Sequence, residues 1–344
     1  MAPQPAPHVA VDHEITVRRG HFWIPGERVE TAHGTVQRAP MFVHWEAPPK
    51  TAHPYPLVLV HGGGGQGTDW TGTPDGRPGW ATRFVEAGFA VYVVDRCGHG
   101  RSPFHPDVVG AMGGQFPYEA AKALFLPDEV RPEQTQWVYE REIGSPHIDQ
   151  LLCPMGPLPA DLAESQRMDA DRLGRLLDIT GPAVLVTHSA GGPVGWLVAD
   201  ARPGRVAAIA AIEPMGPAFA EFPGFGKLAW GLTAHRITYD PELHRPEEAE
   251  NADPATLRIP ALAGTAVAVV TGGSSAFAGF APHVVDFLNT AGARAQHVHL
   301  PEYGITGNGH GLTFESNSDH TIKPVITWIL DHARRSPRNG RHGH

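Results

Sequence analysis

The chain has 344 residues, of which 41% are hydrophobic, so it can bury one large core and does not require a second domain. A formal net charge of −9, with no run of Lys or Arg, argues against a nucleic-acid-binding surface. No stretch approaches the roughly 18 apolar residues of a membrane-spanning helix, so no membrane span is expected.

Cysteine and histidine usage bears on metals and cofactors. Cys97 and Cys153 lie far apart, which indicates neither a metal knuckle nor a disulfide framework. The 21 histidines include no spacing such as H-E-x-x-H, and we expect the rings of His297 and His299 on opposite faces of a strand, where they could not share an ion. We therefore expect no metal and no cofactor.

The amino terminus lacks a basic start followed by an apolar segment, which predicts a cytoplasmic protein. A secreted or periplasmic mature form stays open as the alternative, and a homodimer is one of the assemblies that the sequence allows. Residues 1–12 are rich in Pro and Ala and are expected to be loose.

The strands fall into two groups. Residues 15–19 and 36–46 combine β-branched and aromatic residues between turn signals, which predicts antiparallel strands leading into a sheet. The later strands are short and continuously apolar, as is typical of parallel strands covered on both faces. They are predicted at residues 57–60, 90–94, 183–186, 206–212, 266–270 and 296–300.

Helices alternate with these strands. Residues 321–334 carry aliphatic side chains at i, i+3, i+4, i+7 and i+8, with Asp319 placed to cap the helix. Further helices are predicted at residues 81–87, 193–201 and 282–290, and around Leu173, Leu176 and Leu177. The alternation predicts an α/β protein with a mostly parallel sheet, helices on both faces and functional residues beyond the carboxyl ends of its strands.

Two long segments break the alternation. Residues 103–160 and 217–260 lose regular patterning and are rich in Pro and aromatic residues. We interpret them as cap-like insertions over the sheet of a single domain spanning 1–344, in which 1–54 form the tail and the antiparallel strands. Their aromatic residues either enclose an apolar pocket or form a small core within the cap.

Ser189 ends an apolar strand and is followed by the small residues 190–192 and by a helix that begins with Pro193. This pattern predicts a nucleophile elbow, in which a strained turn exposes the serine hydroxyl. Thr187 stands where the G-x-S-x-G pattern has its first Gly, so from this stretch alone a helix N-cap role for Ser189 is equally open.

A serine hydroxyl needs a base, and we expect His310, in a glycine-flanked loop, to supply it. His320, in the first turn of a helix, is expected to be a solvated surface residue. The imidazolium needs a carboxylate, but residues 271–275 contain no acid, whereas Glu213 ends the preceding strand. The order Ser189, Glu213, His310 therefore predicts the catalytic triad.

Residues 61–67 form a glycine-rich loop that lacks the Lys-Ser/Thr ending of a phosphate-binding P-loop. We expect the N–H groups of Ala190 and of Gly63, or of Gly64, to form an oxyanion hole. Asp95 and Arg96 are expected to pin a turn.

With these motifs the chain resembles the α/β-hydrolase superfamily over residues 55–335. The resemblance rests on His61-Gly62-Gly63-Gly64, on Asp95-Arg96-Cys97-Gly98-His99-Gly100-Arg101-Ser102, on the elbow at Ser189 and on the loop histidine. It is most similar to a small group of bacterial carboxylesterases with a Glu straight after the sixth strand. Residues 73–80 and 307–310 match that group as well.

The resemblance implies an α/β-hydrolase fold and a serine esterase that cleaves a small-molecule carboxylic ester through an acyl-enzyme intermediate. The aromatic residues of the two insertions favour an apolar acyl or alcohol group in that ester. Acyl transfer to an alcohol or amine would use the same triad, and a lactonase is a further alternative. A binding protein that lost catalysis is disfavoured, because all three triad residues are present.

Overall fold

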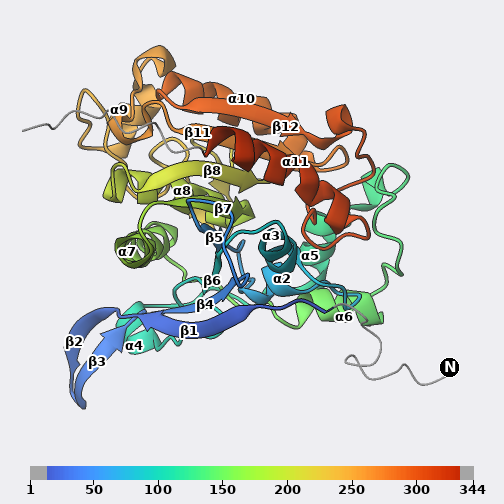
Figure 1. Ribbon diagram of the computed structural model, residues 1–344. Helices are drawn as coiled ribbons and strands as arrows, with labels where there is room; N and C mark the ends of the chain where they lie inside the picture. The colour runs from blue at the N-terminus through green and yellow to red at the C-terminus, as the bar shows by residue number, and fades with distance from the viewer. Residues whose placement is uncertain (1–13, 334–344) are drawn as a thin grey trace, which may run out of the picture.

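The computed structural model describes residues 14–333 and has an eight-stranded central sheet with the order β1-β4-β6-β5-β7-β8-β11-β12 (Figure 1). Its strands are β1 (Arg18–Ile24), β4 (Met41–Ala47), β5 (Leu57–Val60), β6 (Val91–Asp95), β7 (Ala183–His188), β8 (Val206–Ile212), β11 (Ala266–Thr271) and β12 (Arg294–His299). The β1–β4 and β4–β6 pairs are antiparallel and the other pairs are parallel. The predicted mostly parallel α/β sheet is confirmed.

The bounds of the antiparallel strands differ from the prediction. The stretch predicted at 36–46 divides into β3 (Gly34–Arg38) and β4, and β3 pairs with β2 (Glu27–Thr31) in a separate two-stranded sheet. The break has a local cause, because Ala39 adopts a positive φ of 49° and Pro40 has no N–H for a ladder. The strand predicted at 15–19 is β1, which starts and ends later.

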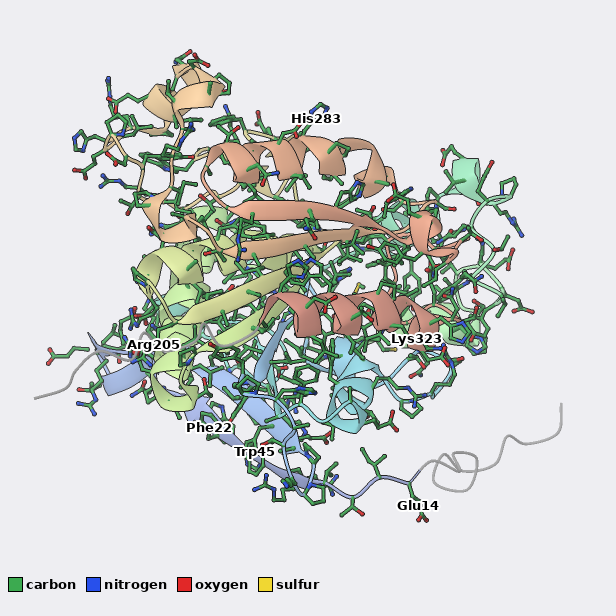
Figure 2. The ribbon with its side chains drawn as sticks, turned by 45° about the horizontal axis from the view of Figure 1, so that its top comes forward. Glu14, Phe22, Trp45, Arg205, His283 and Lys323 are labelled. Atoms are coloured by element: carbon green, nitrogen blue, oxygen red, sulfur yellow. The ribbon has the colours of Figure 1, made fainter. Side chains whose placement is uncertain are left out.

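Two hydrophobic cores cover the two faces of the sheet, and they use alternate residues of each buried strand. In β5, for example, Val58 and Val60 belong to one core, and Leu57 and Leu59 to the other. The first core is covered by α7 (Leu162–Thr180), α8 (Gly192–Ala201) and α10 (Ala276–Thr290), and the second by α3 (Trp80–Glu86) and α11 (Ser318–His332). Figure 2 shows His283 of α10 at the outer edge of the molecule, and Lys323 of α11, on the helix that covers the other face, is exposed as well.

Two helix starts were predicted wrongly. Helix α10 begins six residues before Pro282, because Ser275 accepts a hydrogen bond from the N–H of Phe277 and caps it. Helix α11 begins at Ser318 after the N-cap residue Asn317, so Asp319 lies within the first turn and does not cap the helix.

The segment 103–160 carries short helices and a hydrophobic cluster of its own. It contains α4 (Pro106–Val109), α5 (Tyr118–Phe125), η1 (Asp128–Val130) and α6 (Pro146–Leu152). Residues of α5 and α6 pack together with Trp137 and with Phe314, which lies near the carboxyl-terminal helix. The aromatic side chains of the segment therefore serve partly as a small core.

The remaining elements are short and lie in connecting segments. They are α2 (Thr68–Thr71), η2 (Ser189–Gly191), β9 (Glu221–Phe222), β10 (Gly226–Lys227), α9 (Pro246–Asn251), η3 (Pro254–Thr256), η4 (Pro260–Leu262) and η5 (Leu300–Tyr303). Within residues 14–333, no helix has both the length and the apolar character needed to cross a bilayer. Residues 1–12, expected to be loose, lie outside the described part of the chain, as does residue 334 of the last predicted helix.

Candidate active site

Ser189 lies between β7 and α8 in the strained turn that the sequence predicts. Its φ of 51° is in the left-handed region, which a residue with a Cβ rarely adopts. The following glycines allow the close approach of neighbouring segments, since a Cβ on Gly191 would lie 2.5 Å from the carbonyl oxygen of His61. A Cβ on Gly192 would lie 2.7 Å from the Cβ of Pro214. The turn therefore presents the Ser189 hydroxyl beyond the end of the strand.

Thr187 replaces the first glycine of the usual elbow pattern, and α8 provides the room for it. A Cβ at Gly195 of α8 would lie 3.4 Å from the Thr187 methyl group, so a glycine on the helix stands opposite the extra side chain. The Thr187 hydroxyl is buried and has no hydrogen-bond partner among the described residues. A threonine therefore fits at this position of the elbow, but its hydroxyl is left as an unpaired buried polar group.

The three residues predicted as a triad lie in contact at the carboxyl ends of the strands. The Nε2 atom of His310 is 3.0 Å from the Ser189 Oγ, and its Nδ1 atom is 3.3 Å from the Glu213 Oε2. Glu213 directly follows β8, the sixth strand of the main sheet along the chain, and has a positive φ of 48°. His310 lies in the loop between η5 and α11.

The surroundings of Glu213 suit a carboxylate that only accepts hydrogen bonds. The N–H of Gly272 donates to Oε1 at 2.7 Å, and the hydroxyl of Ser275 donates to Oε2 at 2.5 Å. Burial raises the pKa of Glu213, while the hydrogen bonds from Ser275 and Gly272 favour its ionised form. Ser275 was not predicted as part of the site, although a serine before a helical pattern was a visible capping signal.

His310 is buried, and burial lowers its pKa to about 3, so the ring is neutral at neutral pH. With Nδ1–H donated to Glu213, the lone pair of Nε2 faces the hydroxyl of Ser189. The arrangement can therefore accept a proton from the serine and hold the resulting imidazolium beside a carboxylate.

The glycine loop lies beside the elbow. A Cβ on Gly63 would lie 3.3 Å from that of Ala190, and both residues line the cavity that reaches Ser189. The N–H of Ala190 is at the start of η2, where amides have no partner within the helix. Gly64 does not line this cavity, and its carbonyl accepts a hydrogen bond from the N–H of Gly156.

Other histidines near the site do not bond Ser189. The Nε2 of His188 is 3.2 Å from the carbonyl oxygen of His310, and burial lowers the pKa of His188 to about 3. His320 is exposed on α11, as expected.

The prediction that His297 and His299 lie on opposite faces of their strand is wrong. Side chains two residues apart in a strand share a face, and the Thr271 Oγ1 is 2.8 Å from the Nε2 of His297 and 3.1 Å from the Nδ1 of His299. Within residues 14–333, no group of three or more His, Cys, Asp or Glu side chains could hold a metal ion.

The family profile described as "alpha/beta hydrolase fold" matches residues 55–233. The chain belongs to the α/β-hydrolase family. It is 32% identical to the "Probable secreted lipase phiG" of Fungal sp. (strain ATCC 74256), over 86% of this chain and 87% of that protein. A bacterial esterase of known structure superposes with a TM-score of 0.71 at 22% identity, covering 97% of this chain and 100% of that one. The resemblance to the superfamily is thereby confirmed.

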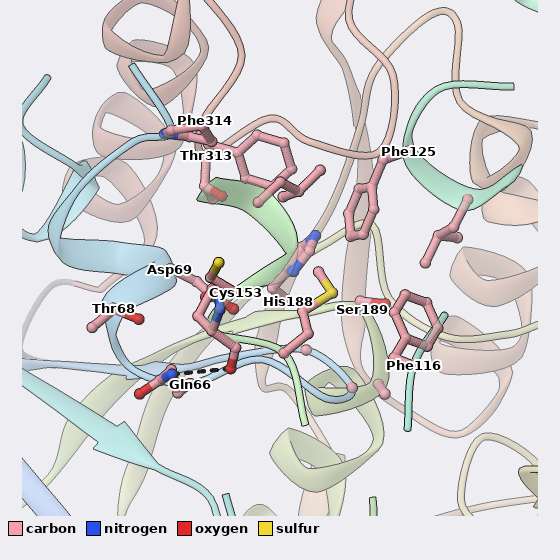
Figure 3. Close-up of a pocket in the computed structure, with 18 of the residues that line it drawn as sticks. Gln66, Thr68, Asp69, Phe116, Phe125, Cys153, His188, Ser189, Thr313 and Phe314 are labelled. Atoms are coloured by element: carbon pink, nitrogen blue, oxygen red, sulfur yellow. Dashed lines mark hydrogen bonds between the residues drawn. The ribbon is translucent and has the colours of Figure 1, made fainter. Parts of the chain in front are cut away.

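In this α/β hydrolase, a cavity of about 710 Å³ reaches Ser189 (Figure 3). Its lining is largely apolar. Six phenylalanine side chains contribute to it: Phe116, Phe125, Phe222, Phe225, Phe277 and Phe314. They come from both segments expected to be insertions and from the core of the fold. Polar side chains gather at the end of the cavity formed by α2, away from Ser189 and Phe116 (Figure 3).

The loop that carries His310 is held by Glu315, a buried carboxyl that sequence reasoning missed. Its Oε1 accepts hydrogen bonds from the N–H of Gly309 at 2.9 Å and from the Nε2 of Gln134 at 3.0 Å, and its Oε2 accepts one from the Nδ2 of Asn308 at 2.7 Å. Burial raises the pKa of Glu315 to about 7. Glu315 thus joins the loop that bears His310 to the segment 103–160.

The turn after β6 has the structural role expected of it. Asp95 accepts hydrogen bonds from the N–H groups of Gly67 and Arg101 at 2.7 Å each. Arg96 forms a fully buried ion pair with Asp169 at 2.8 Å.

Proposed function

We propose that the protein is a serine hydrolase that cleaves carboxylic esters through an acyl-enzyme intermediate. The observation that carries this proposal is the contact of Ser189 Oγ with His310 Nε2 at 3.0 Å, with Glu213 on the other ring nitrogen. The relative named as a lipase supports the ester as the bond cleaved, and the largely apolar cavity supports an apolar acyl or alcohol group.

The reaction follows from these contacts. His310 Nε2 takes the proton as the Ser189 Oγ attacks the ester carbon, and the N–H groups of Ala190 and Gly63 stabilise the oxyanion. His310 returns the proton to the departing alcohol, and water then attacks the acyl-enzyme by the same route. Glu213 fixes the tautomer of His310 and stabilises its charged form.

A fluorophosphonate reagent tests the nucleophile. We expect it to add to Ser189 and abolish ester turnover, and Ser189→Ala to abolish both labelling and turnover. Ser274→Ala, at a serine in the loop after β11, is the matched control and should retain both. Labelling that maps to Ser274 would overturn the proposal.

An ester panel graded in acyl size, run with and without an added alcohol, separates hydrolysis from acyl transfer. Release of free acid as the main product is expected, whereas an ester of the added alcohol as the main product would favour a transferase. The name of the fungal relative supports secretion as the alternative to the predicted cytoplasmic location.

A further inference from the structure

Asp69 is an acidic side chain in the catalytic cavity that the proposed reaction does not use. It lies in the first turn of α2, directly after the glycine loop, and lines the same cavity as Ser189. Figure 3 shows Asp69 with Thr68, Gln66 and Cys153 at one end of the cavity, and Ser189 with Phe116 at the other. The cavity therefore joins an acidic end to the proposed nucleophile along apolar walls.

No cation in the described part of the chain neutralises the Asp69 carboxyl. Burial raises its pKa to about 7, the charge of Asp95 acts in the same direction, and a hydrogen bond from the backbone of Gln66 opposes the shift. No side chain among residues 14–333 donates a hydrogen bond to it. The side-chain amide of Gln66, which also lines the cavity, is already used, because its Nε2 donates to the carbonyl oxygen of Pro154 at 2.9 Å.

The carboxyl of Asp69 lies directly against Gly65 of the glycine loop. A Cβ at residue 65 would clash with the Asp69 Oδ2, so the carboxyl occupies the space that the missing side chain leaves. Asp69 is partly exposed at the cavity wall, and with one backbone partner and no counter-charge its carboxyl keeps hydrogen-bonding capacity that nothing in the described chain uses. Such a group in a cleft is typical of a binding site, because a ligand can supply the missing partner.

We propose that Asp69 forms a subsite for a cationic group of the substrate, and that the preferred substrates are esters with a protonated amine at the far end of an apolar chain. The ester group lies at Ser189, the chain lies along the phenylalanine side chains, and the ammonium donates to the carboxylate of Asp69. This assignment of the substrate class rests on the proposed esterase function.

Two series of esters test it, one with an ω-amino group in the acyl chain and one with it in the alcohol, each graded in length. Each ester is compared with a control ester of the same length that has a methyl group in place of the ammonium. At the chain length that spans the cavity, we expect the wild-type protein to have a higher kcat/KM for the amine than for its methyl partner. In Asp69→Asn, which can still accept the hydrogen bond from Gln66, this preference should fall by about tenfold or more.

Hydrolysis of the methyl-terminated esters and fluorophosphonate labelling of Ser189 should persist in Asp69→Asn, which shows that the variant is folded. Asp107→Asn removes an exposed carboxylate on α4 and should leave the preference unchanged. The subsite is overturned if no length in either series favours the amine, or if the preference survives in Asp69→Asn. If wild-type protein hydrolyses no ester and Ser189 is not labelled, the proposed function itself fails, and the subsite fails with it.

Discussion

Replacing Glu213 by Gln should place His310 in the wrong tautomer. The N–H of Gly272 cannot turn away, so the amide oxygen of the new side chain must accept from it, and the amide NH₂ then points toward Ser275 and His310. The Ser275 hydroxyl can rotate to accept, but a protonated Nδ1 on His310 would meet a second donor. The ring therefore carries its proton on Nε2 and cannot accept one from Ser189.

The expected loss in kcat is about 10⁴-fold, the size found when the acid of a serine-protease triad is replaced by its amide. The fold should be retained, because the hydrogen bond to Gly272 and the side-chain volume are kept. The assay is steady-state hydrolysis of an activated ester, with the rate of fluorophosphonate labelling as a second measure of nucleophile activation and a thermal melt as the stability control.

Asp286→Asn is the matched control, since it makes the same chemical change at an exposed position of α10 and should leave kcat unchanged. If Glu213→Gln keeps more than about a tenth of the wild-type kcat, against the far larger loss expected for a triad acid, another acid orients His310 and the tautomer argument is refuted.

Three further outcomes are expected. Activity is lost as pH falls through the pKa of His310, and because burial lowers that pKa, the acid limb of kcat/KM should lie below the ordinary value of 6.5; a limb above pH 7 would contradict this. Thr187→Val removes an unpaired buried hydroxyl and should raise the free energy of unfolding by about 1 kcal/mol, whereas Thr321→Val removes a buried hydroxyl that donates to the carbonyl oxygen of Leu312 at 2.7 Å and should lower it in the same denaturation assay. Glu315→Leu should lower kcat by about tenfold or more by releasing the N–H of Gly309. Glu315→Gln keeps the acceptor for Gly309 but turns an NH₂ toward the Nδ2 of Asn308, so its loss should be smaller; equal losses would show that the bond to Gly309 is not what matters.

The site positions that the sequence could place correctly at the edge of the sheet are those marked by their immediate neighbours. Ser189 follows an apolar strand and precedes small residues, and Glu213 is the acid that ends the adjacent strand. Each could be assigned to the carboxyl edge of a parallel sheet without knowledge of any long-range contact. The mostly parallel architecture followed from the same local patterns.

The residues that it missed act through partners far along the chain. Glu315 meets Gln134 from a segment 181 residues away, and no periodicity marks that pair. Ser275 lies 62 residues from Glu213, and although its capping signal is visible in the sequence, nothing local indicates that its hydroxyl donates to Glu213. The faces of His297 and His299 were a different failure, because the period of a strand alone should have placed both rings together.

The segment 103–160 is hydrogen-bonded to the loop that bears His310 through main-chain atoms as well as side chains. The N–H of Gln136 donates to the carbonyl oxygen of Gly307, and the N–H of Ser316 donates to that of Gln136, each at 3.0 Å. This segment is therefore not an interchangeable module. A chimera that received the corresponding segment of a relative, in order to change substrate range, would also receive new contacts to the loop that bears His310. We expect it to lose turnover unless residues 306–316 are transferred together with the segment.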